Sequence, residues 1–287
     1  MDTDPRLAAF REHRPLLFSI AYRMLGSVAD AEDLVQEAYL RWLKADPAEV
    51  GSAKNYLGAT VTRLAVDQLR SARVRREVYV GPWLPEPLVG VDERDPIAAT
   101  EVADSLSTAF LVLLERLTPN QRAAFLLREV FGYEYPEVAR VLRTSEANCR
   151  QLVQRAKHAV ASGRPRFASD TGAAQDLARR FLDACTTGDV DDLVALLASD
   201  AVAWSDGGGK FSAARRPVFG AERVARFISG VLAKWRGSGD VRIDRINGGL
   251  GLSFHVATQL RGVITFDTAG DRVGQIFMVV NPDKLHD

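Results

Sequence analysis

Apolar residues recur at helical spacing through the first part of the chain. Within residues 7–44 they form two stripes, at residues 16–24 and 34–42, and the pair Gly26-Ser27 separates them. Recurrence at positions i, i+3, i+4 and i+7 predicts amphipathic helices. We therefore expect two helices joined by a tight turn, the second capped by Ser27 or Asp30.

The same spacing predicts further helices. One covers roughly residues 53–76, with its apolar stripe buried and its arginines outward. Another begins at residues 118–121 (TPNQ), where Thr caps, Pro fits the first turn and Gln can complete a capping box. A short helix opening at Pro136, a turn at residues 143–144 and a longer basic helix over residues 145–162 follow. This order indicates a helix-turn-helix whose second helix would lie in the DNA major groove. Helical hairpins in enzymes share the pattern.

The pattern changes after Gly163-Arg164-Pro165. Two helical segments, DLARRFLDAC and VDDLVALLA, precede the run WSDGGGK and a helix GAERVARFISGVLAKW. Four runs with strand character follow: VRIDRI, LSFHVATQL, RGVITFDT and QIFMVV. Helices followed by such runs predict a C-terminal α+β domain, a cone of antiparallel strands covered by helices.

Length and composition favour a multidomain cytoplasmic protein. A chain of 287 residues with 47% hydrophobic and 26% charged residues has room for two or three compact units. It has no run of about 18 apolar residues to span a bilayer, and its N-terminus is too polar for a signal peptide. We expect no membrane partner. Cys149 and Cys185 lie in unrelated segments, which favours reduced thiols over a disulfide or a metal site.

The net charge of zero hides three charged zones. Residues 54–76 carry six Lys or Arg against Asp67 alone, and residues 140–166 carry seven against Glu146 alone. Residues 28–37 are acidic. Two basic patches and one acidic patch suggest at least two kinds of partner, although solvated helix faces are the alternative.

Four runs carry a resemblance to a known family. DAEDLVQEAYLRW, TRLAVDQLRSARVRRE, LTPNQRAAFLLREVFGYEYPEVARVL and SEANCRQLVQRAK resemble regions two and four of extracytoplasmic-function sigma factors, in order and spacing, over about residues 10–163. The resemblance implies that the acidic second helix binds core RNA polymerase, and that the third helix and the helix-turn-helix bind promoter DNA.

The resemblance also assigns residues to these roles. The core-polymerase contacts would be Asp33, Gln36, Glu37 and Arg41. The proximal-promoter residues would be Tyr56, Arg63, Asp67, Arg70, Arg73 and Arg76. The distal-promoter residues would be Glu146, Asn148, Arg150, Gln151, Gln154, Arg155 and Lys157.

This chain departs from the family pattern at several positions. Arg63 stands where the family usually has Asn, and Tyr56 replaces a commoner Trp, so that packing is as good an interpretation of Tyr56 as stacking on an unpaired base. Arg143 occupies a turn position usually given to Gly, and Thr144 replaces an aliphatic residue. A non-glycine residue in the left-handed region costs about 1 kcal/mol, so we expect a weaker or differently shaped turn.

Residues 172–287 resemble, by order of elements, the SnoaL-like branch of the nuclear-transport-factor-two-like superfamily. Some of these relatives are enzymes that use a pocket carboxylate as general acid or base. This sequence offers no convincing acid–base pair, because Asp206 sits in a Gly-rich turn and His255 is a single strand histidine typical of a core residue. The run DGGGK lacks the spacing of a phosphate loop. We predict no catalytic residue, cofactor or metal, and we leave open a small-molecule ligand of the pocket.

The run GPWLPEPLVG (residues 81–90) lies between the two sigma regions. Its prolines predict an extended, preordered segment that can dock at low entropic cost. A SigJ-like subgroup of these sigma factors, with a fused SnoaL-like domain, shares WLPEP, DGGGK and a terminal NPDKL. That resemblance implies cis regulation by the C-terminal domain, through a contact in which Trp83 dominates and Glu86 pairs with Lys210 or Lys284. A stiff spacer is the alternative. The predicted contact residues are Trp83, Leu84, Pro85, Glu86, Pro87, Asp206, Gly207, Gly208, Gly209, Lys210, Asn281, Pro282, Asp283, Lys284 and Leu285.

We therefore predict a multidomain protein. Two all-α sigma domains (1–80 and 101–165) flank a linker (81–100) and precede an α+β SnoaL-like cone (166–287). Its predicted role is that of a non-enzymatic RNA polymerase sigma factor with three partners: core RNA polymerase, promoter DNA and its own C-terminal domain in cis. The alternatives are a ligand-sensing helix-turn-helix regulator and a SnoaL-type pocket enzyme fused to a DNA-binding region. The acidic second helix has no purpose in either alternative.

Overall fold

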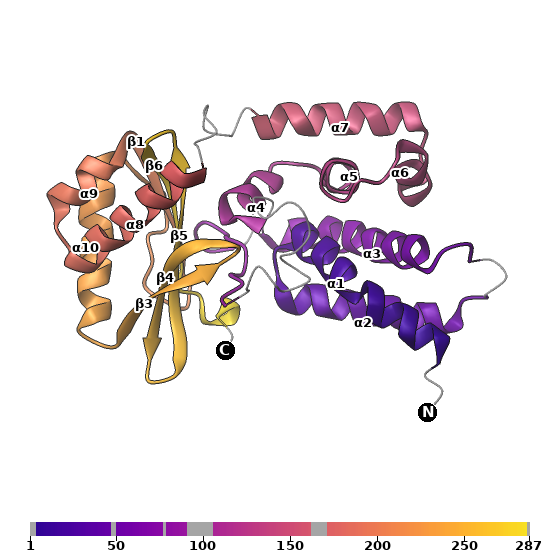
Figure 1. Cartoon of the computed structure of the whole chain (residues 1–287), viewed down its shortest axis with the longest axis horizontal. Helices are drawn as coiled ribbons and strands as arrows, with labels where there is room; N and C mark the ends of the chain where they lie inside the picture. The colour runs from indigo at the N-terminus through magenta and orange to yellow at the C-terminus, as the bar shows by residue number, and fades with distance from the viewer. Residues whose placement is uncertain (1–3, 47–49, 77–78, 91–105, 162–170, 286–287) are drawn as a thin grey trace. The chain divides into compact units, whose positions relative to one another are not determined.

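The chain divides into two compact units, each described by itself (Figure 1). The computed structural model describes residues 4–46, 50–76, 79–90, 106–161 and 171–285, without the side chains of residues 72–76 and 171–174. The first unit, the helical unit, comprises residues 1–77, 93–106 and 110–163. The second, the C-terminal unit, comprises residues 78–92, 107–109 and 164–287.

Three long helices form the first half of the helical unit: α1 (Pro5–Leu25), α2 (Val28–Lys44) and α3 (Ala53–Arg76). Gly26 ends α1 with a left-handed φ of 68°, and its N–H donates to the Tyr22 carbonyl. Ser27, not Asp30, caps α2, because its Oγ accepts from the Asp30 N–H at 3.2 Å. The three helices pack on one another around Leu17, Ile20, Met24, Val35, Leu57 and Val61.

The second half of the helical unit contains the predicted helix-turn-helix. Its elements are α4 (Thr108–Leu114), whose first two residues belong to the C-terminal unit, α5 (Pro119–Phe125), the π-helix η3 (Leu126–Val130), α6 (Tyr135–Leu142) and α7 (Glu146–Ala161). The capping box at Thr118 and Gln121 is present, as predicted. Arg122 is buried, and its guanidinium donates to the carbonyls of Leu114 and Met24 at 2.9 and 2.6 Å and pairs with Glu115 at 2.8 Å. One arginine therefore ties α5 to α1.

The C-terminal unit has the predicted α+β architecture (Figure 1). Helices α8 (Thr171–Thr187), α9 (Val190–Leu196) and α10 (Ala221–Arg236) cover one face of a six-stranded sheet, and the 3-10 turn η4 (Pro282–Lys284) follows the last strand. The sheet order is β2-β1-β6-β5-β4-β3. The strands are β1 (Leu197–Asp206), β2 (Val218–Phe219), β3 (Asp240–Ile246), β4 (Gly249–Val256), β5 (Gln259–Ala269) and β6 (Arg272–Val279).

The sheet is mixed, which corrects the expectation of purely antiparallel strands. Strand β1, which the sequence pattern did not reveal, pairs in parallel with β6, whereas the other neighbouring strands are antiparallel. Ser205 lies opposite Met278, and Asp206 lies opposite Val279. Because successive residues of a strand point to opposite faces, Ser205 belongs to the helix-covered face and Asp206 to the other face.

Candidate functional site

The outward side of α2 carries the residues predicted to contact polymerase. Its buried stripe consists of Ala31, Leu34, Val35, Ala38 and Trp42. Asp33, Gln36 and Arg41 are exposed on the opposite side. Glu37 is partly buried and accepts a hydrogen bond from Arg41 Nε at 2.7 Å. The four side chains therefore share one polar face.

Two leucines of the same helix are exposed as well. Leu40 is 46% exposed and Leu43 is 39% exposed. They were not predicted from the sequence, because a leucine at helical spacing is usually counted with the core. Their spacing from Gln36, at i+4 and i+7, was the signal that placed them on the polar face. An apolar pair beside exposed charges is typical of a protein-binding surface.

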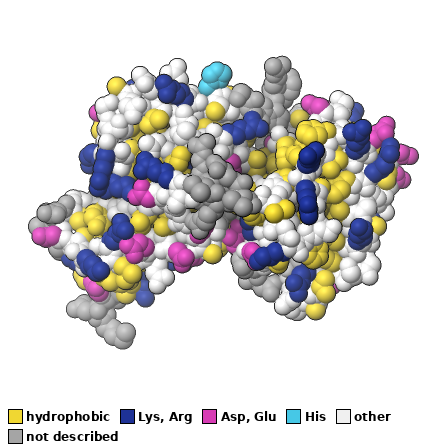
Figure 2. Space-filling view, turned by 180° about the vertical axis from the view of Figure 1, so that it is seen from behind, with side chains coloured by type: hydrophobic (Ala, Val, Ile, Leu, Met, Phe, Trp, Pro, Cys, Tyr) yellow, Lys and Arg dark blue, Asp and Glu magenta, His cyan; other side chains and the backbone are white. Residues whose placement is uncertain are grey.

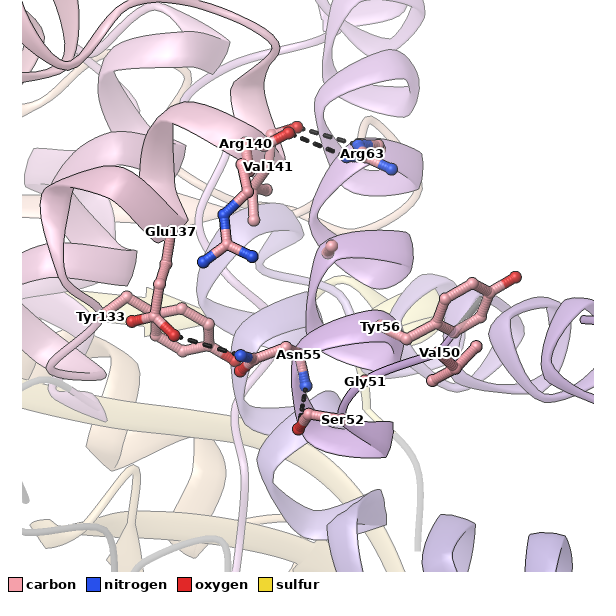
Figure 3. A pocket seen from close by; sticks show the side chains of 11 residues that line it. Val50, Gly51, Ser52, Asn55, Tyr56, Arg63, Tyr133, Glu137, Arg140 and Val141 are labelled. Atoms are coloured by element: carbon pink, nitrogen blue, oxygen red, sulfur yellow. Dashed lines mark hydrogen bonds between the residues drawn. The ribbon is translucent and has the colours of Figure 1, made fainter. Parts of the chain in front are cut away.

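Arg63 fastens α3 to α6 (Figure 3). Its Nε donates to the Val141 carbonyl and its Nη2 to the Arg140 carbonyl, each at 2.9 Å. Both carbonyls belong to the last turn of α6, whose C-terminal end carries partial negative charge. Burial, and then the neighbouring Arg143 cation, lower the pKa of Arg63. A residue predicted to read the promoter thus binds the helix-turn-helix.

The other proximal-promoter residues lie along the same helix. Tyr56 packs against Trp42 with ring centroids 5.6 Å apart, which agrees with the packing interpretation. Asp67 and Arg70 are exposed and pair at 3.3 Å. The side chains of Arg73 and Arg76 lie outside the described residues.

A cavity of about 440 Å³ opens between α3 and α6 (Figure 3). Asn55 Nδ2 donates to Glu137 Oε1 across it at 3.2 Å. Tyr133 is buried there, and its hydroxyl has no hydrogen-bond partner among the described residues. Burial raises the pKa of this phenol to about 12. With Tyr56, Arg63 and Arg140, the walls combine aromatic rings and cations, the mixture that contacts single-stranded nucleic acid.

The turn of the helix-turn-helix accommodates a non-glycine residue. Arg143 adopts φ 53° and ψ 50°, which confirms the left-handed position. Its N–H bonds to the Ala139 carbonyl, and the N–H of Thr144 bonds to the same carbonyl at 3.0 Å. Asn148 Nδ2 then donates to Thr144 Oγ1 at 2.9 Å. The hydroxyl of Thr144, in place of an aliphatic side chain, joins the turn to α7.

Helix α7 buries one side and exposes the other. Cys149, Val153, Ala156 and Val160 form the buried side. Of the predicted DNA-contacting residues, Glu146 is partly buried and the remaining six are exposed: Asn148, Arg150, Gln151, Gln154, Arg155 and Lys157. In Figure 2, acidic and basic side chains are mixed over the part of the helical unit where α1 and α2 lie, and Lys and Arg side chains are scattered among hydrophobic and other side chains towards α7.

Two of these cations already have partners. Arg150 pairs with Glu146 at 3.2 Å and stands 4.7 Å from the Tyr135 ring centroid. Lys157 pairs with Glu129 at 2.6 Å. Such exposed pairs contribute under about 1 kcal/mol each and can exchange for phosphate contacts.

In the C-terminal unit, residues 79–90, here called the strap, lie against Asp206. This carboxylate is fully buried at the end of β1, not in the Gly-rich turn that the sequence suggested. It accepts hydrogen bonds from Tyr79 Oη at 2.5 Å, the Leu84 N–H at 2.9 Å and Lys284 Nζ at 2.8 Å. The N–H of Gly208 donates to it at 3.1 Å. Four donors satisfy one buried charge. Burial, and then the Asp206 carboxylate, raise the pKa of Tyr79.

Lys284 holds the strap from its other side. Its Nζ donates to the Leu84 carbonyl at 2.5 Å and stands 4.1 Å from the Trp83 ring centroid. Both backbone polar groups of Leu84 are therefore engaged by side chains of the C-terminal unit. The ammonium over the indole adds a cation–π contact.

The second half of the strap joins the sheet. The Leu88 N–H donates to Asn247 Oδ1 at 3.0 Å, and the Asn247 N–H donates to the Leu88 carbonyl at 2.9 Å. Val89 forms an isolated antiparallel bridge with Ile246. The strap thus pairs briefly with β3, the last strand in the sheet order, as an added strand would.

The DGGGK and NPDKL motifs contact the strap and one another. Asn281 Nδ2 donates to Tyr79 Oη at 2.9 Å, and Lys210 pairs with Asp283 at 2.6 Å. Gly208 has φ 60°, and a Cβ there would overlap the Asn281 side chain. Glycine is therefore required for the two motifs to approach one another.

Two expectations differ from the structure. Leu84, with 1% exposure, is the buried anchor of the strap, whereas Trp83 is only partly buried. Glu86 is itself buried, and its pairing with Lys210 or Lys284 stays a prediction. His255 is partly exposed and lies 3.5 Å from Ser253 Oγ, so it is not a core residue. The alternation of side chains between the two faces of a strand does not show which of them a neighbouring segment will bury.

Both cysteines are buried free thiols, and burial raises the pKa of Cys185 to about 12. Within the described ranges, no group of three His, Cys, Asp or Glu residues could hold a metal ion. Among the same residues, no helix has the length and apolar character needed to cross a membrane.

Known proteins resemble both parts of the chain. The Sigma-70 region 2 model matches residues 9–75, and the Sigma-70 region 4 model matches residues 107–160. The ECF RNA polymerase sigma factor SigJ of Mycobacterium tuberculosis is 41% identical over 96% of this chain and 91% of its own length. The probable ECF RNA polymerase sigma factor SigI of the same organism is 31% identical over 98% and 95%.

The crystal structure of Mycobacterium tuberculosis SigJ resembles the whole fold. Its TM-score is 0.78 at 36% identity, and the match covers 97% of each chain. The likeness therefore extends over the sigma regions and the C-terminal α+β domain together. This chain belongs to the extracytoplasmic-function family of RNA polymerase sigma factors.

Proposed function

We propose that this sigma factor recruits core RNA polymerase to specific promoters and that its C-terminal unit controls it in cis by holding the strap. One observation carries the proposal: the fully buried Asp206 accepts hydrogen bonds from the strap residues Tyr79 and Leu84. The strap follows α3 with only residues 77 and 78 between them. Its attachment therefore acts on the chain segment that joins the two promoter-binding halves. The proposal places the protein in the cytoplasm, with transcription, and assigns no catalytic reaction to it.

The core-polymerase contact is assigned to the outward face of α2. Asp33, Gln36, Glu37 and Arg41 supply its charges and hydrogen bonds. The exposed Leu40 and Leu43 supply the apolar area that a stable protein interface needs at its centre.

The DNA contacts are assigned to α3 and α7. The exposed face of α7 offers amides, which suit base edges, and arginines, which suit guanine edges or phosphates. On α3, Tyr56 and Arg63 line the cavity towards α6. Promoter binding by Arg63 therefore requires its contact with α6 to open.

The test of cis control compares two charge insertions in the strap. In Leu84→Asp a carboxylate replaces the buried anchor, and in Val80→Asp it replaces a side chain that is already 46% exposed. Burying an unpaired carboxylate costs several kcal/mol, so we expect Leu84→Asp alone to release the strap. Limited proteolysis should then cut within residues 79–90 at least about tenfold faster.

Transcription by reconstituted polymerase on genomic promoter fragments gives the functional measurement. We expect the output of Leu84→Asp to differ from that of the native chain and the output of Val80→Asp to match it. Cis control is rejected if proteolysis shows a released strap while transcription is unchanged.

A further inference from the structure

A second cavity lies inside the C-terminal unit, on the helix-covered face of the sheet. Its volume is about 460 Å³, within the range of small-molecule sites. Helix α10 forms one wall through Phe227, Val231 and Trp235, and the sheet forms another through Phe254 and Met278. The segment 211–214, which follows the DGGGK motif, contributes a third. The cavity lies on the face of β1 opposite to Asp206. Ser205 and the segment 211–214 also line a smaller pocket together with Val80 and Gly81 of the strap.

The walls favour flat apolar groups. Trp235, Phe254 and Met278 are each at least nine-tenths buried. The rings of Trp235 and Phe254 are stacked, with centroids 4.9 Å apart and an interplanar angle of 8°. Two parallel rings present a flat surface on which another ring can pack in an offset or edge-to-face arrangement.

Ser205 supplies the polar feature of this apolar site. The residue lines the cavity with 2% exposure. Its Oγ is buried and has no hydrogen-bond partner among the described residues. Most buried hydroxyls are paired, and an unpaired one is unfavourable, so an exception requires an explanation. A ligand oxygen would provide the missing partner.

We propose that this cavity binds a compact, mainly apolar, ring-containing molecule with one oxygen that hydrogen-bonds to Ser205. The site is separate from the hydrogen bonds that Asp206 accepts from the strap, because Asp206 belongs to the other face of the sheet. Binding there can be measured without polymerase, so a failure of this proposal is distinguishable from a failure of cis control.

The test uses three probes with the full chain: 2-naphthol, which has two fused rings and one hydroxyl, naphthalene, which lacks the hydroxyl, and 1-decanol, which lacks the rings. Equilibrium dialysis should give saturable binding of one 2-naphthol per chain. Because a hydrogen bond contributes modestly in net terms, Ser205→Ala should weaken 2-naphthol about three- to tenfold and leave naphthalene unchanged. Decanol should bind more weakly than 2-naphthol to the native chain.

Two further variants test the location. Val231→Phe places a ring in the cavity and should abolish binding of both aromatic probes, whereas Phe219→Ala, at a side chain that is 60% exposed and does not line the cavity, should leave both unchanged. Melting temperatures show which variants are folded. Non-saturable binding, undiminished binding to folded Val231→Phe, or an equal loss of both aromatic probes in Ser205→Ala would overturn the assignment. Equal affinity for decanol would overturn the ring-containing class.

Discussion

At the scale of single residues, Asp206 shows how a buried charge can specify a contact. A carboxylate with no exposure is unfavourable unless donors surround it, and here a phenol, two backbone N–H groups and an ammonium do so. Removing the strap would take away two of these donors. The buried charge therefore raises the free energy of the state in which the strap is detached, because Asp206 then lacks two of its four donors.

Tyr79 makes strap attachment dependent on pH. Burial and Asp206 raise the pKa of the phenol above its ordinary value of about 10. The attached state keeps its proton where the detached state has lost it, so attachment is fully stable below pH about 10 and weakens as pH rises above that value. An ultraviolet titration of tyrosinate should show one tyrosine fewer ionising near pH 10 in the native chain than in Leu84→Asp. Tyr79→Phe should remove this difference, and a native chain identical to Leu84→Asp would contradict the coupling.

The residues that form the strap contact were predictable from the sequence where they belong to a motif, but the partner of each residue was not. The pairing of WLPEP with DGGGK and NPDKL was predicted from the resemblance, and the structure brings the three motifs together around Asp206 and Lys284. The sequence placed Trp83 at the centre because an indole has the largest apolar area. Leu84 is buried instead because both of its backbone groups are held by Asp206 and Lys284.

At the scale of elements, α2 combines a buried stripe with a face that has no internal role. We expect the double reversal Asp33→Lys and Glu37→Lys to weaken core-polymerase binding by more than about tenfold, because two attractive charges become repulsive. Glu12→Lys, at an exposed acidic position on α1, is the matched control and should bind normally. Affinity measured by fluorescence anisotropy, with circular dichroism as the folding check, decides the matter. Equal affinities for the double reversal and Glu12→Lys would remove α2 from the interface.

Elements with local signals were predictable, and those built on distant pairing were not. Caps at Ser27 and Thr118, and proline at the start of α5, mark helix starts in the sequence itself. Strand β1 begins directly after α9, at Leu197, without a glycine or proline between them. Its identity as a strand depends on parallel pairing with β6, more than seventy residues away, which no local pattern contains.

At the scale of the whole molecule, contacts within the helical unit join its two promoter-binding halves, and the connecting strap belongs to the other unit. Arg63 and Arg122 provide polar contacts between the halves. The family resemblance alone predicted two separate sigma domains and gave no sign that residues of α3 would bind α6. The replacement of the usual Asn by Arg at position 63 was the available signal, because only the longer side chain reaches the carbonyls of Arg140 and Val141.

That replacement gives the last prediction. Arg63→Asn should remove two hydrogen bonds to the end of α6, a change of about 1–3 kcal/mol, and so favour separation of α3 from α6. A cysteine pair, Asn55→Cys with Glu137→Cys, reports closure through a short bifunctional maleimide, which spans the gap that the shorter cysteines leave where the native side chains meet at 3.2 Å; the two native thiols are buried. Crosslinking should slow by up to about tenfold in Arg63→Asn, since each 1.4 kcal/mol corresponds to a factor of ten.

Arg11→Asn is the control, because it removes a guanidinium from an exposed position on α1. Equal rates in the two variants would show that Arg63 does not hold the halves together. The guanidinium of Arg63 cannot bind the carbonyls of α6 and a nucleotide at the same time. Promoter DNA bound with polymerase should therefore slow the same crosslink in the native chain, and it should have a smaller effect in Arg63→Asn, where the competing contact is already lost.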